Sequence, residues 1–230
     1  MISEKNAPRL LGAAFLFVFA VSILSNLMTD SVVGSGNMSD ILASVSDNTA
    51  LMRSGVLVGL LTSIGIVVLA VMFYIVTKHQ NKLLALVGLG WWLAEAITLA
   101  ASKIGALALI PLSQDFVKAG APEASHFQAL GDFLYFGLFK QGDDIHMLFY
   151  SIGGVLWFYL LFRSRQIPRV LSIPSIAIEF VGLVGMVLLF ATGTANMLLF
   201  YPIMLVEVVV GLWLVVKGAP DRSGARSVAQ

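Results

Sequence analysis

The chain has 230 residues, of which 58% are hydrophobic and 12% are charged, and its mean hydropathy is +0.91. A typical soluble domain is about 45–50% apolar and about 25% charged, so this composition excludes a soluble globular fold and indicates an all-α integral membrane protein. The formal net charge of +1 argues against nucleic-acid binding, which needs a clustered basic surface. The absence of cysteine excludes disulfides, thiolate metal sites and a cysteine nucleophile.

Six apolar runs are each long enough to cross a bilayer, for which a helix needs about 20 residues. They cover residues 10–28, 54–76, 83–103, 145–162, 170–191 and 196–216, and the third can continue to Pro111. No cleavage site of small residues follows the short polar start, so the first run is predicted to be retained. We expect a six-helix transmembrane domain over residues 1–218 and a polar, disordered tail over residues 219–230.

Basic residues gather on one side of the six predicted spans. On that side lie Lys5, Arg9, Lys78, Lys82, Arg163, Arg165, Arg169, Lys217, Arg222 and Arg226. The opposite loops hold Arg53, Lys118 and Lys140, together with most of the aspartates. Cytoplasmic loops of membrane proteins carry an excess of lysine and arginine, so both termini are predicted to lie in the cytoplasm.

The two long outer loops are each predicted to hold a short interfacial helix. In the first loop, Ser39 is expected to cap a helix that carries Ile41, Leu42 and Val45. In the second loop, Pro122 suits a first helical turn, and an aromatic-rich run over residues 127–139 follows it. This run is too short and too interrupted to span, so we expect it to lie in the membrane interface or to cap the bundle.

Three glutamates, Glu95, Glu179 and Glu207, sit inside apolar runs, where a charged residue costs at least ~2.5–3.5 kcal/mol. At about 1.5 Å per residue they lie about 18, 14 and 15 Å from the cytoplasmic ends of their spans, in a similar layer. Thr98 shares a helical stripe with Glu95, and Ser175 shares one with Glu179. Small and hydroxyl residues mark helix contacts in bilayers, so these stripes are predicted to point inward.

A second group of candidate residues lies near the outer boundary: Lys103, Asp143, Asp144, His146 and Tyr150. Negative charge is favoured at a helix N-terminus, which suits the two aspartates at the start of the fourth span. Lys103 can reach the outer headgroups or pair with either aspartate. His146 is expected to lie too far outward to join the glutamates, so no metal site is assigned. No feature of the sequence identifies a cofactor.

The sequence leaves several functions open. The glutamates can lock helices together, or they can handle protons, cations or a small lipophilic ligand. The alternatives are a membrane enzyme that uses carboxyls as acid and base on a lipid-like substrate, and a non-catalytic subunit or scaffold. No P-loop, GxSxG or HExxH motif is present, so no reaction is assigned. The expected partners are the lipid bilayer and a membrane protein or a second copy of the chain, not nucleic acid.

Several motifs follow one another along the chain. They are Arg9 with Gly12, Phe73-Tyr74, Asn81 to Leu86, His146 to Leu148, the Ile167-Pro168-Arg169 turn, and Pro202, Glu207, Gly211, Leu212, Trp213, Leu214 and Gly218. In this order they resemble a bacterial membrane family known as domain of unknown function 4386. The resemblance implies a six-helix protein of the bacterial inner membrane and supplies no activity. Trp92 stands where that family commonly has arginine, so the family's intramembrane Arg–Glu pair is not expected beside Glu95.

Overall fold

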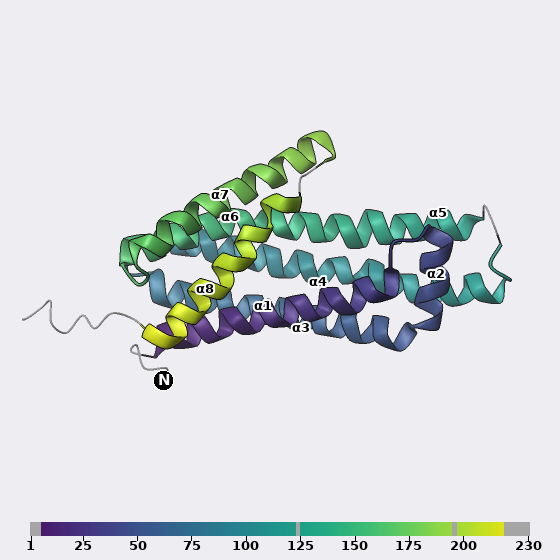
Figure 1. The fold of residues 1–230 in the computed structure, drawn as a ribbon, viewed down its shortest axis with the longest axis horizontal. Helices are drawn as coiled ribbons and strands as arrows, with labels where there is room; N and C mark the ends of the chain where they lie inside the picture. Colours follow the sequence, from purple (N-terminus) through teal and green to yellow (C-terminus); the bar gives the residue numbers. More distant parts are fainter. Residues whose placement is uncertain (1–5, 123–124, 195–196, 219–230) are drawn as a thin grey trace, which may run out of the picture. The chain divides into compact units, whose positions relative to one another are not determined.

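The computed structural model describes residues 6–122, 125–194 and 197–218, and every regular element within these ranges is a helix (Figure 1). The prediction of an all-α chain is therefore confirmed. In chain order the elements are α1 (Ala7–Val33), α2 (Met38–Asp47), α3 (Thr49–Thr77), α4 (Lys82–Lys118), α5 (His126–Asp132), the π-helix η1 (Phe133–Lys140), α6 (Gln141–Ser164), α7 (Arg169–Thr192), the 3₁₀ helix η2 (Met197–Leu199) and α8 (Tyr201–Lys217).

Five helical stretches among the described residues are long and apolar enough to cross a membrane. They are α1, α3, α4, the continuous helix over His126–Ser164, and α7. The sixth predicted span corresponds to α8, whose 17 residues extend about 26 Å against a hydrocarbon core of about 30 Å. Residues 195–196, where that span was expected to begin, lie outside the described residues, as does the tail over 219–230. A sixth span therefore stays a prediction.

All five helices extend beyond the predicted spans, and two of them do so by more than ten residues. The 37-residue α4 continues through Pro111 to Lys118, although proline removes one backbone hydrogen bond. The aromatic run after Pro122 is not a separate short helix, because α5 passes through η1 into α6 without a break. Pro122 itself precedes the helix. Ser125 is the N-cap residue of α5, and its backbone N–H donates to the side chain of Gln128 at 2.8 Å.

Helix α2 lies in the first predicted outer loop, and Asn37 caps it instead of the expected Ser39. The Asn37 side chain accepts from the backbone N–H of Asp40 at 3.1 Å, and the Asp40 carboxylate accepts from the backbone N–H of Asn37 at 3.1 Å. This reciprocal pair satisfies two donors at the start of the helix. The apolar residues predicted for this helix, Ile41, Leu42 and Val45, are all buried. Whether α2 lies at a membrane interface stays a prediction.

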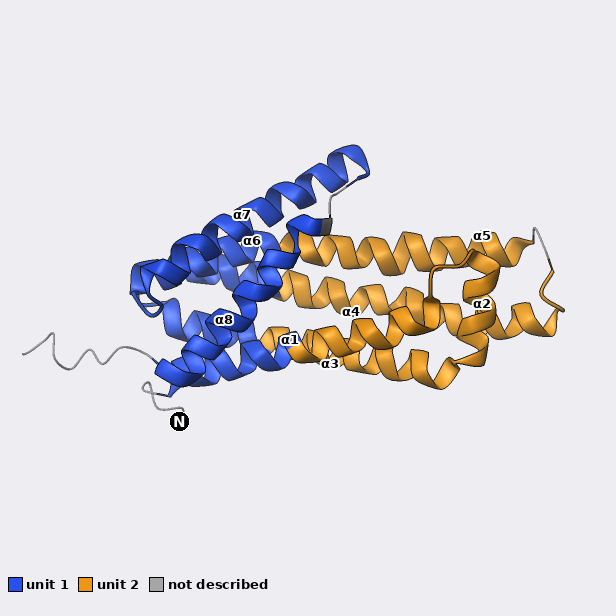
Figure 2. Ribbon diagram, viewed as in Figure 1, with its two compact units in different colours: residues 1–19, 68–92, 150–230 blue, residues 20–67, 93–149 orange. Residues whose placement is uncertain are grey.

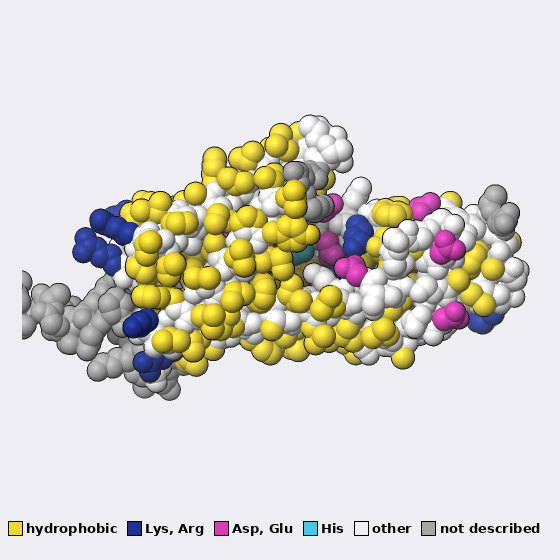
Figure 3. Space-filling view, in the orientation of Figure 1, with side chains coloured by type: hydrophobic (Ala, Val, Ile, Leu, Met, Phe, Trp, Pro, Cys, Tyr) yellow, Lys and Arg dark blue, Asp and Glu magenta, His cyan; other side chains and the backbone are white. Residues whose placement is uncertain are grey.

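The chain divides into two compact units, whose boundaries fall inside α1, α3, α4 and α6 (Figure 2). Unit 1 comprises residues 1–19, 68–92 and 150–230, and unit 2 comprises residues 20–67 and 93–149. Unit 1 carries ten basic and four acidic residues, a net charge of +6, whereas unit 2 carries four basic and nine acidic residues, a net charge of −5. On the face drawn in Figure 3, hydrophobic side chains cover most of unit 1 and basic side chains gather at one end of it.

Each unit has its own packed interior. In unit 1 the centre is aromatic: the ring of Trp92 lies 4.9 Å from that of Phe73 and 5.9 Å from that of Trp157, centroid to centroid. All three side chains are buried. In unit 2 the centre is mostly aliphatic and includes the inward face of α2. One more ring, that of Tyr150, stacks on Trp92 and extends this aromatic centre.

Candidate functional site

Three side chains of unit 1 meet at one hydroxyl group. The phenol oxygen of Tyr150 lies 2.9 Å from Oε1 of Glu179 and 2.9 Å from Oε1 of Glu207. The three residues come from α6, α7 and α8, and together we name them the carboxyl cluster. Glu179 has no exposed surface, Tyr150 is buried, and Glu207 is partly exposed. The cluster therefore joins a fully buried glutamate to a partly exposed one through a single phenol.

Packing against α4 fixes the position of Tyr150. The ring of Trp92 stacks on the Tyr150 ring, with the centroids 6.0 Å apart and the planes 10° apart. The indole Nε1–H of Trp92 also donates to the backbone carbonyl of Tyr150 at 3.2 Å. Gly153, one turn further along α6, leaves room for the indole, since a Cβ there would lie 2.3 Å from Cδ1 of Trp92. The phenol is thus held by a neighbouring ring and a neighbouring helix.

A face of small residues on α7 brings Glu179 to α6. Ser172, Ser175, Gly182 and Gly185 are buried along this face together with the glutamate. A Cβ at Gly154 of α6 would lie 2.7 Å from Oε2 of Glu179, so only glycine permits this approach. Small residues allow helices in bilayers to pack closely. The stripe of small residues in the sequence predicted such a close contact for this face.

Among the described residues, no basic side chain forms an ion pair with the cluster. None of the ion pairs between described residues includes Glu179 or Glu207. Oε2 of Glu179 is buried, and the described part of the chain offers it no hydrogen-bond partner. Burying a charge without a partner is costly, so charge on this carboxyl has to be removed by a proton or balanced by a cation.

The hydrogen-bond count of the cluster requires an additional proton. A phenol has one hydrogen to donate, and an ionised carboxylate can only accept. Two carboxylates at 2.9 Å from the same phenol oxygen cannot both receive that hydrogen. With no cation at the cluster, one carboxyl therefore has to carry its own proton and donate it to the phenol oxygen. The three oxygen atoms form a line along which such a proton can be exchanged.

The candidate residues predicted near the outer boundary are divided between the two units. Lys103 is 3% exposed, and its ammonium pairs with Oδ1 of Asp143 at 3.1 Å, as one of the predicted alternatives had it. The hydroxyl of Ser102 donates to the same carboxylate oxygen at 2.8 Å, and the ring of Phe139 lies 4.6 Å from the ammonium. Tyr150 does not belong with these residues of unit 2, because it lies in the carboxyl cluster of unit 1.

The remaining candidates contribute less. Thr98 donates to the carbonyl of Ala94 at 2.8 Å and Ser175 donates to that of Leu171 at 2.7 Å, so both hydroxyls bond to their own helices. Glu95 is buried in unit 2, where Asp144 and His146 are partly buried. Within the described ranges no three His, Asp or Glu side chains come together as metal ligands would. Ligand or cation binding at these residues stays a prediction.

Sequence reasoning placed Glu179 and Glu207 in one layer but missed the residue that joins them. Tyr150 was grouped with Asp143 and His146 because they are close along the chain. The side chain of Tyr150 points instead toward the two glutamates, and the stacked Trp92 and the pair Gly153-Gly154 hold it there. Two adjacent glycines at the middle of a span were the available signal, since they mark a close approach of two neighbouring helices.

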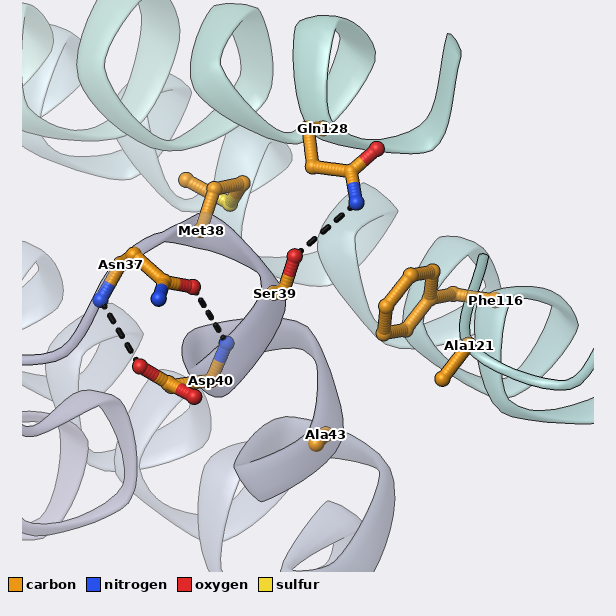
Figure 4. A pocket seen from close by; sticks show the side chains of 8 residues that line it. All are labelled: Asn37, Met38, Ser39, Asp40, Ala43, Phe116, Ala121 and Gln128. Atoms are coloured by element: carbon orange, nitrogen blue, oxygen red, sulfur yellow. Dashed lines mark hydrogen bonds between the residues drawn. The ribbon is translucent and has the colours of Figure 1, made fainter. Parts of the chain in front are cut away.

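Unit 2 contains a cavity of about 550 Å³ that no candidate residue lines (Figure 4). Its walls come from the start of α2, the end of α4, the turn after it and α5. Across it the amide of Gln128 donates to the hydroxyl of Ser39 at 2.9 Å. The lining residues are Asn37, Met38, Ser39, Asp40, Ala43, Phe116, Ala121 and Gln128. The polar groups shown there already bond to one another, so nothing at this cavity indicates a ligand.

Comparisons with known proteins identify one family and confirm the resemblance seen in the sequence. A family model described as "Domain of unknown function (DUF4386)" matches residues 10–218. The search of curated proteins and the search of solved structures each gave no match. The match covers all three residues of the carboxyl cluster and supplies no activity for them.

Proposed function

The chain belongs to the DUF4386 family, and from its carboxyl cluster we propose that it is a bacterial inner-membrane protein that handles protons within the bilayer. The observation that carries the proposal is the Tyr150 hydroxyl, which lies 2.9 Å from a carboxyl oxygen of both Glu179 and Glu207. Such an arrangement stores a proton where water is scarce. A proton can pass along it by exchanging which oxygen donates, without movement of the backbone.

The position of Glu179 supports a site inside the membrane. Glu179 lies ten residues into α7, about 15 Å along a helix that is long and apolar enough to span. Ionisable groups at such depth are rare and commonly mark proton or ion pathways. The proposal takes α8 as the sixth span, with its partly exposed Glu207 as the group through which the proton enters and leaves.

The distribution of charge supports the orientation in this proposal. The basic residues of unit 1 fall before, between and after the spans on the side predicted to be cytoplasmic, and the acidic residues gather in unit 2. The absence of cysteine makes a direct test simple, because each introduced cysteine is a unique label. We expect Asp47→Cys to react with an impermeant maleimide from outside intact cells and His79→Cys to react only after the membrane is opened. The reverse pattern would reject this orientation.

Proton movement is tested with the purified protein in liposomes that carry a pH-sensitive dye. We expect wild-type liposomes to dissipate an imposed pH gradient faster than protein-free liposomes do, in the presence of valinomycin and potassium. Glu179→Gln and Glu207→Gln should each return the rate to that of protein-free liposomes, since an amide cannot carry the shared proton. The matched control is Asp115→Asn, which neutralises an exposed carboxylate of unit 2.

Equal rates for the wild type and both glutamine variants would remove the proposal. The carboxyl cluster would then only join α6, α7 and α8. Size-exclusion profiles and melting curves of each variant are needed beside the flux, so that a loss of rate is not confused with a loss of fold.

A further inference from the structure

We propose that a small monovalent cation displaces the shared proton of the carboxyl cluster, binding at Glu179 while the proton leaves through Tyr150 and Glu207. This inference rests on the proposed proton site and names a cation that binds there in place of the proton. It starts from an asymmetry between the two glutamates. Oε2 of Glu179 is buried without a hydrogen-bond partner in the described part of the chain, whereas Glu207 is partly exposed.

The asymmetry decides which of the two glutamates carries the proton when no cation is bound. When Glu179 carries the proton, it donates through Oε1 to the phenol oxygen, the phenol donates to Glu207, and the negative charge rests on the more accessible carboxylate. In the opposite arrangement the charge rests on Glu179, whose second oxygen packs against Gly154 and receives no hydrogen bond from any described group. An uncompensated buried charge is costly, so the first arrangement is favoured. Only an added positive charge at Glu179 reverses that preference.

The displacement conserves charge and protons. A cation M⁺ arrives at Glu179, the carboxyl of Glu179 gives its proton to the phenol oxygen, and the phenol gives its own proton to Glu207. Glu207 then releases that proton to water. One cation enters and one proton leaves, so the cluster carries one net negative charge before and after. Tyr150 is unchanged at the end, because it has accepted one proton and donated another.

The ligand class follows from the groups available. One released proton balances one monovalent charge. A divalent ion would change the net charge of the cluster, because only one carboxyl proton is present to be released. Within the described ranges no third carboxylate or histidine joins the two glutamates. Hard oxygen ligands suit alkali cations, so lithium, sodium and potassium ions are the probes, with choline as the cation too large to enter.

The first experiment uses the unmodified protein. Dicyclohexylcarbodiimide reacts with protonated carboxyl groups in apolar surroundings, and mass spectrometry of the digested protein locates the adduct. We expect the adduct on Glu179. A cation at about ten times its Kd leaves about one site in eleven free, so labelling should slow about tenfold in the chloride of that cation. Labelling that is equally fast in lithium, sodium, potassium and choline chloride would overturn the inference, and so would an adduct on Glu207 alone.

The second experiment tests the route through the phenol. Sodium or lithium chloride is added to weakly buffered protein in detergent, and a pH dye counts the released protons. The wild type should release one proton per bound cation, and Tyr150→Phe should lose most of this release. Tyr159→Phe is the matched control, because it removes a hydroxyl from the same helix at a residue that is 37% exposed. Equal release from Tyr150→Phe and the wild type would overturn the route.

The two proposals fail in different ways. Proton flux that depends on Glu179 and Glu207, together with labelling that no cation slows, would keep the proton site and reject the cation. Flux that is unchanged in both glutamine variants would reject the proton site itself. Cation protection of Glu179 without proton release would also reject the exchange, because the charge would then be balanced in another way.

Discussion

Carboxyl groups are held inside both units of this protein, but different partners hold them. In unit 2 Asp143 pairs with the buried ammonium of Lys103 at 3.1 Å. In unit 1 Glu179 and Glu207 share the hydroxyl of Tyr150, and no ion pair between described residues reaches them. Unit 2 balances the charge of Asp143 with Lys103, whereas we propose that a proton balances the charge in unit 1.

The difference shows that the group balancing a buried carboxyl tells more about its role than the fact that the carboxyl is buried. A buried ion pair supplied by the protein is complete, so removing either partner leaves an unbalanced charge. Two carboxyls joined by a phenol need an added proton to complete their hydrogen bonds, and such a proton can exchange with water. The substitutions below break or sharpen this contrast, starting from the largest expected effect.

Neutralising Asp143 should have the largest effect on stability. Asp143→Asn leaves the ammonium of Lys103 buried without its counter-charge, which should lower the free energy of unfolding by about 3 kcal/mol. The control is Asp115→Asn in the exposed pair with Lys118, where a change below about 1 kcal/mol is expected. Thermal and denaturant unfolding in detergent measure both. Equal effects of the two variants would mean that burial does not distinguish these pairs.

Adding one methyl group beside the aromatic centre should be the next most damaging change. Gly153→Ala places a Cβ 2.3 Å from Cδ1 of the buried Trp92, and overpacking of this kind costs about 1–3 kcal/mol. Gly90→Ala is the matched control, because a Cβ there meets nothing within 4 Å and alanine favours a helix by about 1 kcal/mol. Melting curves should therefore move in opposite directions. A harmless Gly153→Ala would show that Tyr150 is not held by this contact.

Removing the N-cap of α2 should have a moderate effect that is confined to unit 2. Asn37→Ala deletes the acceptor for the backbone N–H of Asp40 and should cost about 1 kcal/mol. Asn48→Ala at the other end of α2 removes an exposed contact and should stay within about 0.5 kcal/mol. Hydrogen exchange should show faster opening of α2, while the exchange of α7 and α8 stays unchanged. A matching change in α7 would show that the two units unfold together.

Neutralising Glu179 should have the smallest effect on stability, although it abolishes proton handling. The amide of Glu179→Gln can donate to the phenol oxygen as the protonated carboxyl does, so the free energy of unfolding should change by less than about 1 kcal/mol. This is the direct counterpart of Asp143→Asn. If both substitutions cost the same, Glu179 is charged and paired in the folded protein, and the contrast between the units disappears.

The helical class, the five helices long and apolar enough to span, and the inward orientation of Glu95 and Glu179 could be predicted from the sequence. The apolar runs and their basic flanks decide these features locally, because a bilayer requires every backbone amide to be paired within its own helix. The helix ends were less predictable. Side-chain caps and the continuity of α5 with α6 depend on contacts of single residues, which is why Asn37 caps α2 and Pro122 precedes α5.

The sequence by itself determined that Glu179 and Glu207 lie at a similar distance along apolar helices, since the rise per residue fixes that distance. The tertiary structure alone decided that Tyr150, 29 residues before one glutamate and 57 before the other, joins them. Rotation and approach of helices depend on which side chains fit between them. Here Gly153 admits the indole of Trp92 and Gly154 admits Glu179, and spacing along one chain does not encode that fit.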